Sequence, residues 1–319
     1  MKIVIPGGSG QVGTLLARAF VKDGHEVVVL SRSPSARAKW RVLPWNSKSS
    51  GDWAAELEGA DVVINLAGRS VNCRYSTKNR EEIMRSRIDS TRAVGEAISK
   101  AKRPPRVWLQ ASTATIYADR YDAANDETAG LIGGSEPNVP DTWRFSIDVA
   151  TSWEKAALEA GPLSDTRLVL LRSAMTMSPD RDSIFDVLLG LVRLGLGGSA
   201  GSGRQYVSWI HDLDFIRAIY WLIEHDEISG PVNLSAPEPL PYAEFMRALR
   251  DAAGIKIGLP ATKWMLEIGA FFMRTETELV LKSRRVVPGI LLKHGFQFQF
   301  PNWPEAAHDL GRRWISEKS

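Results

Sequence analysis

The sequence GGSGQVG at residues 7–13 decides the fold class, and it directly follows a short apolar run, KIVIP, at residues 2–6. Glycines with this spacing permit a tight turn and allow backbone N–H groups to approach a pyrophosphate closely. A helical pattern of apolar residues begins inside the motif and continues over residues 12–23. A glycine-rich turn between a first strand and a first helix is typical of a dinucleotide-binding βαβ unit, and a purely structural glycine turn is the alternative.

Short β-branched runs alternate with helical patterns along the chain. The strand-like runs lie at residues 2–5, 25–30, 61–66, 106–110, 167–172 and 231–234, and the helical patterns at residues 12–23, 82–100, 147–160, 184–194, 213–224 and 242–253. This alternation predicts an α/β fold, a Rossmann doubly wound parallel sheet with a smaller C-terminal substrate or cap lobe. A proline-rich boundary lies at residues 237–241. We therefore expect a Rossmann domain formed by residues 1–173 and 205–235, and a smaller lobe formed by residues 174–204 and 236–319.

Composition and charge restrict the classes of partner. The 319 residues are 44% hydrophobic and 24% charged, with a net charge of +3, which is ordinary for a soluble protein and gives no basic stripe for a nucleic acid. The most apolar window, residues 264–273, is interrupted by Glu267 and is shorter than the roughly 18 residues that a membrane span requires. The single cysteine, Cys73, and five scattered histidines predict neither an internal disulfide nor a metal site. We expect a cytoplasmic protein without nucleic-acid or membrane partners.

The end of the second strand selects the form of the cofactor, because it meets the adenosine ribose. An acidic residue there binds the 2′-hydroxyl of NAD(H), but this chain has Ser31 and Arg32, with Arg37 nearby. A guanidinium suits a 2′-phosphate in charge and in its forked donors, so the sequence predicts NADP(H). An arginine in a solvated loop is the alternative. The contacts predicted from the glycine motif and this strand end are Gly7, Ser9, Gly10, Gln11, Val12, Gly13, Ser31 and Arg32.

The motif NLAG at residues 65–68, following the glycine motif, resembles the extended short-chain dehydrogenase/reductase superfamily. A narrower resemblance, to the atypical epimerase-family proteins (NAD-dependent epimerase/dehydratase-like) that end in a small domain of unknown function, covers nearly the whole chain. It is carried by SRIDST at residues 86–91, WEKAA at 153–157, GLGG at 195–198, SWIH at 208–211 and RRVVP at 284–288. The resemblance implies NADP(H) binding, with further cofactor contacts from Leu66, Ala67, Gly68, Glu82 and Arg87.

The chain departs from the superfamily at its catalytic pair. None of the six tyrosines is followed four residues later by lysine, so the usual Tyr-x-x-x-Lys acid–base pair is absent. Alignment through the WEKAA motif places Ser146 and Ala150 in the positions of Tyr and Lys. Ser112 stands where the superfamily has its active-site hydroxyl, and Tyr117 is a candidate proton donor to a carbonyl oxygen. The alternative is that Ser112 satisfies backbone groups and that Tyr117 is half-buried packing.

Two further sets of residues invite a functional interpretation. His211 and Asp212 directly precede a helical pattern, where Asp is a normal N-cap, so we interpret the pair as structural, with catalysis as the alternative. Trp143, Trp153 and Trp209 are candidates for the floor of an apolar pocket, although such residues are more often core packing. Exposed aromatic residues in the smaller lobe would suit a homodimer.

The leading interpretation is an NADP(H)-dependent oxidoreductase or epimerase-like enzyme that acts on a small carbonyl or sugar-like substrate. The hydride chemistry belongs to the nicotinamide, with Ser112 and Tyr117 as the candidate catalytic residues. The alternative function is a non-catalytic NADPH-binding sensor or scaffold protein, which the absence of Tyr-x-x-x-Lys favours. Retention of Ser112, Tyr117 and an entire cap lobe favours the enzyme.

Overall fold

The computed structural model describes residues 1–34, 38–160, 163, 165–261 and 277–318. Arg37, the sequence Gly161-Pro162 at the expected end of a helix, and the apolar window at residues 264–273 lie outside these ranges. None of the helices within the described ranges combines the length and apolarity that a membrane span requires.

The centre of the molecule is a parallel sheet of seven strands in the order β10-β6-β5-β4-β1-β2-β3. The strands are β1 (Lys2–Pro6), β2 (Glu26–Ser31), β3 (Arg41–Pro44), β4 (Val62–Asn65), β5 (Val107–Thr113), β6 (Arg167–Ser173) and β10 (Gly230–Leu234). The chain order reverses beside β1, which pairs with β2 on one side and with β4 on the other. This arrangement confirms the predicted Rossmann fold, and it places the expected ligand site at the carboxyl ends of β1 and β4.

Helices cover both faces of the sheet, so its strands are apolar on both sides. On one face, α1 (Gln11–Lys22) and α5 (Asp212–Glu224) bury Leu16, Phe20 and Phe215 against β1, β2 and β10. On the other face lie α2 (Thr77–Lys100) and α3 (Asp141–Leu158), which pack against each other and against the strands. Helix α2 begins five residues before the expected start, because the hydroxyl of Ser76 caps it by accepting from the backbone N–H of Asn79.

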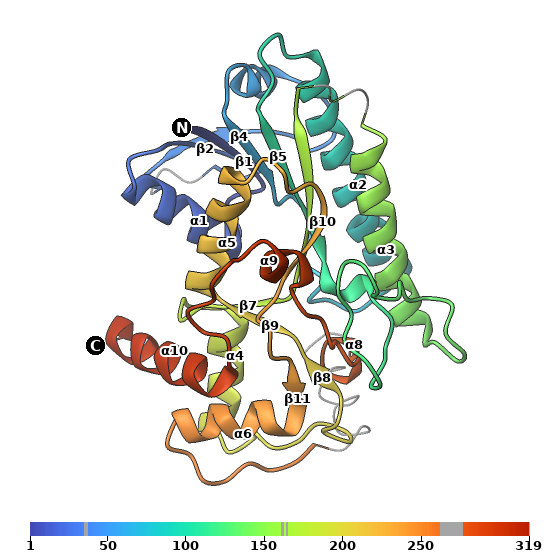
Figure 1. Ribbon diagram of the computed structural model, residues 1–319, viewed down its shortest axis with the longest axis vertical. Coiled ribbons are helices and arrows are strands. Elements are labelled where there is room, and N and C mark those ends of the chain that lie inside the picture. Colours follow the sequence, from blue (N-terminus) through green and yellow to red (C-terminus); the bar gives the residue numbers. More distant parts are fainter. Residues whose placement is uncertain (35–37, 161–162, 164, 262–276, 319) are drawn as a thin grey trace.

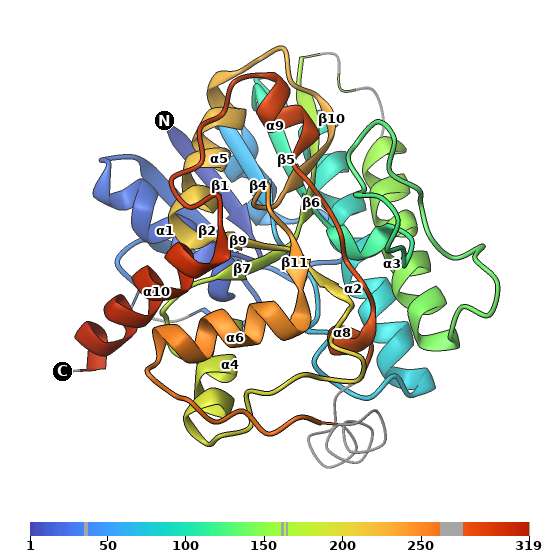
Figure 2. The same ribbon diagram turned by 60° about the horizontal axis from the view of Figure 1, so that its bottom comes forward.

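A smaller lobe lies below the carboxyl ends of the strands (Figure 2). It contains α4 (Ile184–Arg193), α6 (Tyr242–Ala252) and α10 (Trp303–Lys318). Two two-stranded sheets join it to the Rossmann part, β7 (Met175–Met177) with β9 (Trp209–His211) and β8 (Tyr206–Val207) with β11 (Leu240–Pro241). Its core is aromatic, since Trp209, Phe245 and Trp303 are all fully buried. The ring centre of Trp303 lies 5.0 Å from that of Trp209 and 4.1 Å from that of Phe245.

The C-terminal part of the chain differs from the expected division at residue 236. After α8 (Glu278–Leu281) the chain returns to the Rossmann sheet, where α9 (Gly289–Lys293) packs beside β10 (Figure 1). Leu291 and Phe296 are buried in the same apolar cluster as β10 and α5. This contact removes both side chains from water and holds α9 on the sheet. Residues 283–298 therefore belong with the large domain, and the chain re-enters the smaller lobe only at α10.

His211 and Asp212 have the structural role that the sequence indicates, with one correction. His211, not Asp212, is the N-cap of α5, and its Nδ1 accepts from the backbone N–H of Leu213 at 3.2 Å. Its other ring nitrogen lies 3.2 Å from Asp309, and its ring stacks on Phe300. Asp212 pairs with Arg313 of α10, so the two residues join the smaller lobe to α5 and lie away from the cavities described below.

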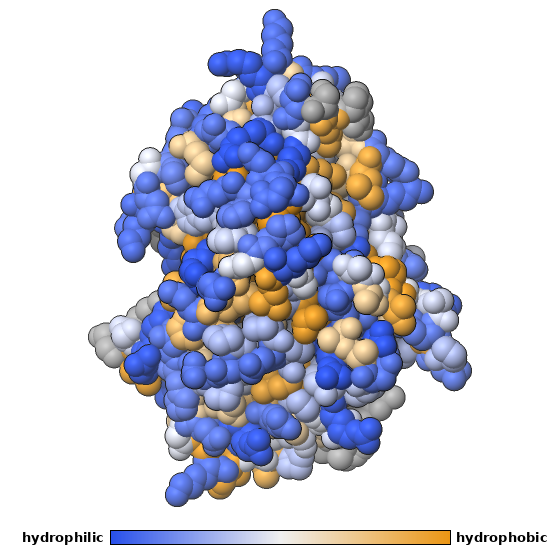
Figure 3. Space-filling view, viewed as in Figure 1, coloured by the Kyte–Doolittle hydropathy of each residue, from blue (hydrophilic) through white to orange (hydrophobic). Residues whose placement is uncertain are grey.

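The surface gives limited support for a homodimer. The face seen in Figure 3 is mainly hydrophilic, with apolar side chains in small groups. Among the described residues, the most exposed apolar side chains of the smaller lobe are aliphatic, namely Leu194, Ile257 and Ile315, whereas Trp209 and Trp303 are buried. The homodimer therefore stays a prediction.

Candidate functional site

The glycine motif forms the loop between β1 and the N-terminus of α1. Gly7 has a φ of +75°, and a Cβ atom there would lie 2.5 Å from the Cα of Ala67. A Cβ on Gly13 would lie 2.4 Å from the Cα of Gly8, so the helix packs directly on the loop. Gly10 is the N-cap, and the first turn of α1 contains no acidic residue. The positive end of the helix dipole therefore faces the loop, as anion binding requires.

A groove runs from this loop along the carboxyl ends of the strands. Its first part, about 270 Å³, is lined by Gly7, Ser9 and Gly10 and by the turn from Leu66 to Gly68. Its second part, about 460 Å³, lies against α2. The two parts share the side chains of Arg32, Ser47, Arg69 and Ser86, so we treat them as one nucleotide groove.

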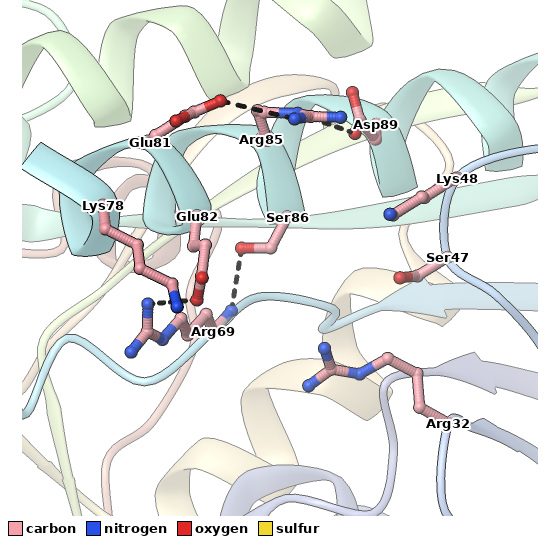
Figure 4. Close-up of a pocket in the computed structure, with 10 residues that line it drawn as sticks. All are labelled: Arg32, Ser47, Lys48, Arg69, Lys78, Glu81, Glu82, Arg85, Ser86 and Asp89. Carbon is pink, nitrogen blue, oxygen red and sulfur yellow. Dashed lines mark hydrogen bonds and ion pairs between the residues drawn. The ribbon is translucent and has the colours of Figure 1, made fainter.

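Two side chains, Arg32 and Lys48, form a cationic cluster in the second part of the groove, with the hydroxyl of Ser47 beside them. Arg32 from the end of β2 and Ser47 and Lys48 from the loop after β3 all face α2 across the cavity (Figure 4). The loop is held by Asn46, whose Oδ1 accepts from the backbone N–H groups of Lys48 and Ser49 at 2.9 and 3.1 Å. Among the described residues, neither Arg32 nor Lys48 has a carboxylate partner. Both positive charges are therefore available to an anionic ligand.

Sequence reasoning found Arg32 but not Ser47 or Lys48. The polar run NSKSSG at residues 46–51 follows a short strand that was not among the predicted runs, and that position was the available signal. Ser31, also predicted, is buried, and its hydroxyl donates to Ser9 at 3.1 Å. This bond ties the end of β2 to the glycine loop.

Helix α2 contributes Glu82, which lines the groove as the resemblance implies. Its carboxylate is ion-paired with Arg69, whose Nη2 also donates to Asn79 at 2.9 Å. The backbone N–H of Arg69 donates to Ser86 at 3.0 Å (Figure 4). Glu82 thus positions Arg69, a groove residue that the sequence reasoning missed although it directly follows the NLAG motif.

Gln11 and Val12 lie in the first turn of α1 but do not line the groove with their side chains. Gln11 is exposed, and Val12 packs against the apolar cluster shared by α1 and α5. Any contact of these two residues with a ligand is therefore through their backbone N–H groups.

A separate cavity of about 250 Å³ begins at Ser112, at the end of β5. We call it the Ser112 cavity. Its walls come from four parts of the chain, and its lining includes Val71, Tyr75, Ile83, Arg87, Ser112, Phe145, Ser146, Trp153, Glu278 and Arg284. Arg87, predicted as a cofactor residue, lines this cavity and not the nucleotide groove. Its guanidinium lies against Gly68, where an added Cβ would be 3.2 Å from Cζ, so Arg87 stands at the boundary between the two sites.

Ser112 begins a buried hydrogen-bond network. Its hydroxyl donates to Glu154 Oε1 at 2.6 Å, and Arg172 holds both carboxylate oxygens of Glu154 at 2.8 Å. Arg172 also donates to the hydroxyl of Tyr117 at 2.9 Å, and that hydroxyl donates to Asn233 Oδ1 at 2.9 Å. Glu154 and Arg172 satisfy each other inside the protein, which a buried charge requires.

The structure does not bring Tyr117 to the cavity that Ser112 lines. The turn η2 (Ala114–Ile116) directs its ring inward, where it is 2% exposed and packs beside Ala150 and Val286. Its hydroxyl is engaged by Arg172 and Asn233, and burial raises its pKa above the ordinary value. The hypothesis that Tyr117 donates a proton to a ligand is therefore corrected, and Tyr117 instead supports Arg172.

The positions aligned with the usual Tyr-x-x-x-Lys pair hold no acid–base group. Ser146 lines the Ser112 cavity, and its hydroxyl donates to Glu278 at 2.5 Å, whereas Ala150 is buried. Tyr75 also lines this cavity, with its hydroxyl 3.5 Å from that of Ser146. Burial raises the pKa of Tyr75 to about 12, which disfavours the phenolate at neutral pH.

The remaining candidates are placed as follows. Trp153 lines the Ser112 cavity as predicted, while Trp209 lies in the core of the smaller lobe. Trp143 lines neither this cavity nor the nucleotide groove. No group of three His, Cys, Asp or Glu side chains within the described ranges is arranged to hold a metal ion.

Comparisons with known proteins agree with this geometry. The model of the NAD dependent epimerase/dehydratase family matches residues 3–140, and that of a domain of unknown function, DUF1731, matches residues 261–310. The human epimerase family protein SDR39U1 is 30% identical over 314 residues, which cover 97% of this chain and 99% of the human protein. This chain therefore belongs to the epimerase family of short-chain dehydrogenase/reductase proteins.

Two solved structures are similar over almost the whole chain. The crystal structure of human SDR39U1 with NADPH has a TM-score of 0.84 and 29% identity, and the match covers 98% of this chain and 99% of the human one. A nucleoside-diphosphate sugar epimerase from Corynebacterium glutamicum has a TM-score of 0.75 and 26% identity, over 98% of this chain and 58% of that chain. The first of these relatives contains the form of the cofactor that the sequence of this chain predicts.

Proposed function

We propose that this protein binds NADP(H) in the nucleotide groove and is an oxidoreductase or epimerase-like enzyme, with a small carbonyl or sugar-like substrate in the Ser112 cavity. The observation that carries the proposal is the cationic cluster of Arg32 and Lys48 at the end of β2, in a groove that begins at the glycine loop. An acidic residue at this position would repel a 2′-phosphate, whereas Arg32 and Lys48, which have no carboxylate partner in the described part of the chain, attract it.

The residues present fit a dinucleotide. The loop at Gly7 approaches the backbone of Ala67 so closely that a Cβ atom would fill the space, and the N-terminus of α1 points at the same loop. These two features provide for a pyrophosphate, while Arg32, Ser47 and Lys48 provide for the 2′-phosphate. The nicotinamide supplies the hydride chemistry when NADP(H) is bound.

The residues of the chain orient the second ligand. The proton of Ser112 is directed at Glu154, so the hydroxyl presents its lone pairs to the cavity and accepts a hydrogen bond from a ligand hydroxyl or N–H group. Glu154 is a positioning residue, since it acts through Ser112 and is itself fixed by Arg172. The apolar walls at Ile83, Phe145 and Trp153 exclude water from this position.

The test is a pair of titrations of the full chain, one with NADPH and one with NADH, followed by tryptophan fluorescence and by calorimetry. We expect NADPH to bind at least tenfold more tightly than NADH, a difference of about 1.4 kcal/mol. Equal affinities would refute the role of Arg32 and Lys48. A protein that binds neither nucleotide would refute the proposed function as a whole.

A non-catalytic NADPH-binding sensor or scaffold is the second candidate, and one observation favours it. The tyrosine nearest to Ser112 in the sequence, Tyr117, has its hydroxyl locked in a buried network and is not placed for proton transfer to a ligand in the cavity. The discriminating experiment adds aldehydes, quinones and keto-sugars to the NADPH-bound protein and follows the absorbance of the reduced nicotinamide. Oxidation with any of them would exclude the sensor.

A further inference from the structure

We propose that Tyr75 is the proton donor of the Ser112 cavity, where its phenol delivers a proton to the carbonyl oxygen of the substrate, and that the enzyme is a carbonyl reductase. This inference rests on the proposed function and assigns the acid that Tyr117 does not provide. It starts from the placement of Tyr75, Ser112 and Ser146 in the lining of one cavity.

Tyr75 is held in place from both sides. Its backbone carbonyl accepts from Nε of Arg80 at 3.0 Å, and the next residue, Ser76, caps α2. Its ring packs edge-on against Phe145 of α3, with the ring centres 5.1 Å apart. The phenol therefore bridges from the start of α2 to α3 and is fixed before a ligand binds, as a donor to a reacting atom requires.

The short side chain of Ser146 leaves room for this phenol. Its hydroxyl lies 3.5 Å from the hydroxyl of Tyr75, and both residues line the cavity. A longer side chain at residue 146 would occupy the space of the Tyr75 hydroxyl. The cavity thus receives its phenol from α2 and not from α3.

The two serines of the cavity do not supply a proton to a carbonyl oxygen. Ser112 donates to Glu154 at 2.6 Å, and Ser146 donates to Glu278 at 2.5 Å. A hydroxyl has only one proton, so both serines present lone pairs to a ligand. A carbonyl oxygen accepts hydrogen bonds and donates none, so it needs a donor from another residue.

The N–H groups around the cavity are directed at the protein. Arg284 donates through Nε to the hydroxyl of Thr115 at 3.1 Å and through Nη1 to two backbone carbonyls at 3.3 Å, and its Nη2 lies 3.6 Å from Glu278. Trp153 donates its Nε1 to Thr91 at 3.0 Å. Arg87 lies against Gly68, and the resemblance assigns it to the cofactor.

The remaining hydroxyl groups of the lining belong to Thr113, Thr115 and Tyr75. The two threonine hydroxyls are aliphatic and release a proton far less readily than a phenol, whose ordinary pKa is about 10. Among the described residues that line the cavity, Tyr75 is therefore the group best suited to act as a general acid.

The chemical step balances with the reduced nicotinamide as the reductant. The carbonyl carbon receives the hydride, and the π pair of the carbonyl group moves onto its oxygen. That oxygen takes the proton of Tyr75, and the O–H bonding pair stays on the phenol oxygen as the phenolate. Water protonates the phenolate again after the alcohol has left. One carbonyl compound, one NADPH and one proton give one alcohol and one NADP⁺.

The surroundings of Tyr75 favour this direction of the reaction. Burial, together with the carboxylate of Glu278, raises the pKa of Tyr75 to about 12. Oxidation of an alcohol needs the phenolate at the start, and its population at neutral pH is small. The phenol is a donor at neutral pH and not a base, so the cavity suits reduction of a carbonyl group.

The first test measures the hydrogen bond of Tyr75 without turnover. The full chain, saturated with NADPH, is titrated by calorimetry with N,N-dimethylbenzamide, whose carbonyl accepts a hydrogen bond, which has no proton to donate and which a nicotinamide does not reduce. Tyr75→Phe should weaken its binding about fivefold, the loss of one neutral hydrogen bond. Tyr121→Phe, at an exposed position, should leave the binding unchanged.

The affinity for NADPH is the control for the fold and for the cofactor site, and it should change by less than twofold in both variants. Equal binding of the amide to Tyr75→Phe and to the unaltered protein would overturn the proposal, and so would an amide that does not bind. If Tyr75→Phe weakens NADPH as much as the amide, Tyr75 belongs to the cofactor site and the inference fails while the proposed function stands.

The second test follows turnover with the aldehydes, quinones and keto-sugars. Tyr75→Phe should lower kcat for the oxidation of NADPH on the order of 100-fold, with little change in KM. With the alcohol product and NADP⁺, the rate of the unaltered protein should rise about tenfold per pH unit between pH 7 and 9, because the phenolate fraction grows by that factor below its pKa.

A merely structural role of Tyr75 would not produce this dependence on pH. A flat pH profile, or equal kcat values in Tyr75→Phe and the unaltered protein, would refute the donor and leave the proposed function standing. If no compound oxidises the bound NADPH, the proposed enzyme fails and the inference fails with it.

Discussion

The nucleotide groove and the Ser112 cavity lie at the same edge of one sheet but are built in different ways. The groove is lined by the glycine loop, by strand ends and by one side of α2, and its cations at Arg32 and Lys48 have no carboxylate partner among the described residues. The cavity is made of side chains from residue 71 to residue 284, and its charged groups are mostly paired inside the protein.

This difference separates two physical requirements. A nucleotide brings fixed negative charges, so its site needs backbone donors and open cations that local sequence supplies. A small substrate needs a shaped and dry space, so its site needs buried groups that hold one another in place. Substitutions in the groove should therefore change affinity, whereas substitutions around the cavity should first change stability.

The largest effect is expected for Glu154→Ala. It removes the carboxylate that Arg172 holds at 2.8 Å and leaves a buried guanidinium without its partner. Breaking a buried pair from one side costs about 3–5 kcal/mol in the free energy of unfolding, which urea denaturation measures. Glu159→Ala is the control on the same helix end, because Glu159 pairs with Lys155 at the surface, and it should cost less than about 1 kcal/mol. Equal losses for the two variants would remove the contrast between cavity and surface.

The next effect belongs to the groove and should appear in binding. Gly7→Ala places a Cβ atom 2.5 Å from the Cα of Ala67, at a φ of +75°. The added Cβ forces the loop away from its position against Ala67, so we expect the affinity for NADPH to fall at least tenfold, or about 1.4 kcal/mol, in a fluorescence titration. Gly24→Ala has a similar φ of +79° with no atom within 4 Å of the added Cβ, and it should leave the affinity unchanged. An unaltered NADPH affinity in Gly7→Ala would exclude the loop as the pyrophosphate site.

The same contrast explains what the sequence could predict. Most strands and the glycine loop were predicted because local apolar periodicity and glycine chemistry determine them, and the fold and the family are confirmed. The pairing of Glu154 with Arg172 and the placement of Tyr117 were not predicted, because they depend on how α3, β6 and β10 pack together. Lys48 was missed for a related reason, since its loop reaches the groove only when β3 has joined the edge of the sheet.

Cofactor choice provides the third prediction. Arg32→Ala should weaken NADPH about tenfold, or about 1.4 kcal/mol, and change the affinity for NADH by less than twofold, since only the 2′-phosphate loses a partner. Arg85 lines the same nucleotide groove, but its guanidinium lies 3.4 Å from Glu81 and 3.8 Å from Asp89. Arg85→Ala should therefore weaken NADPH less than Arg32→Ala does. Both dissociation constants are measured at two salt concentrations, because an electrostatic contact weakens as salt is added. Parallel losses for NADPH and NADH would place Arg32 outside the 2′-phosphate site.

The smallest effect is a slope in stability against pH, and it tests how dry the surroundings of the Ser112 cavity are. Lys282 is buried, and its Nζ donates at 2.8 Å to the carbonyl of Thr115, a cavity residue. Burial lowers its pKa from 10.5 to about 8. Above about pH 8 the unfolded chain therefore binds more protons than the folded one, so stability rises with pH, by at most about 1.4 kcal/mol per unit. Buried tyrosines such as Tyr75 titrate in the unfolded chain near pH 10, so urea denaturation between pH 8 and 9 measures the lysine with little contribution from them.

In that window, Lys282→Met should remove the rise in stability, whereas the exposed Lys155→Met should retain it. Methionine occupies a similar volume and has no proton to exchange. The difference in slope between the unaltered protein and Lys282→Met therefore comes from the ammonium of Lys282. If the curves of the unaltered protein and Lys282→Met run parallel, the ammonium is hydrated when the protein is folded. Water would then reach the backbone of Thr115 from behind, and the dry wall that distinguishes the Ser112 cavity from the open nucleotide groove would not exist on that side.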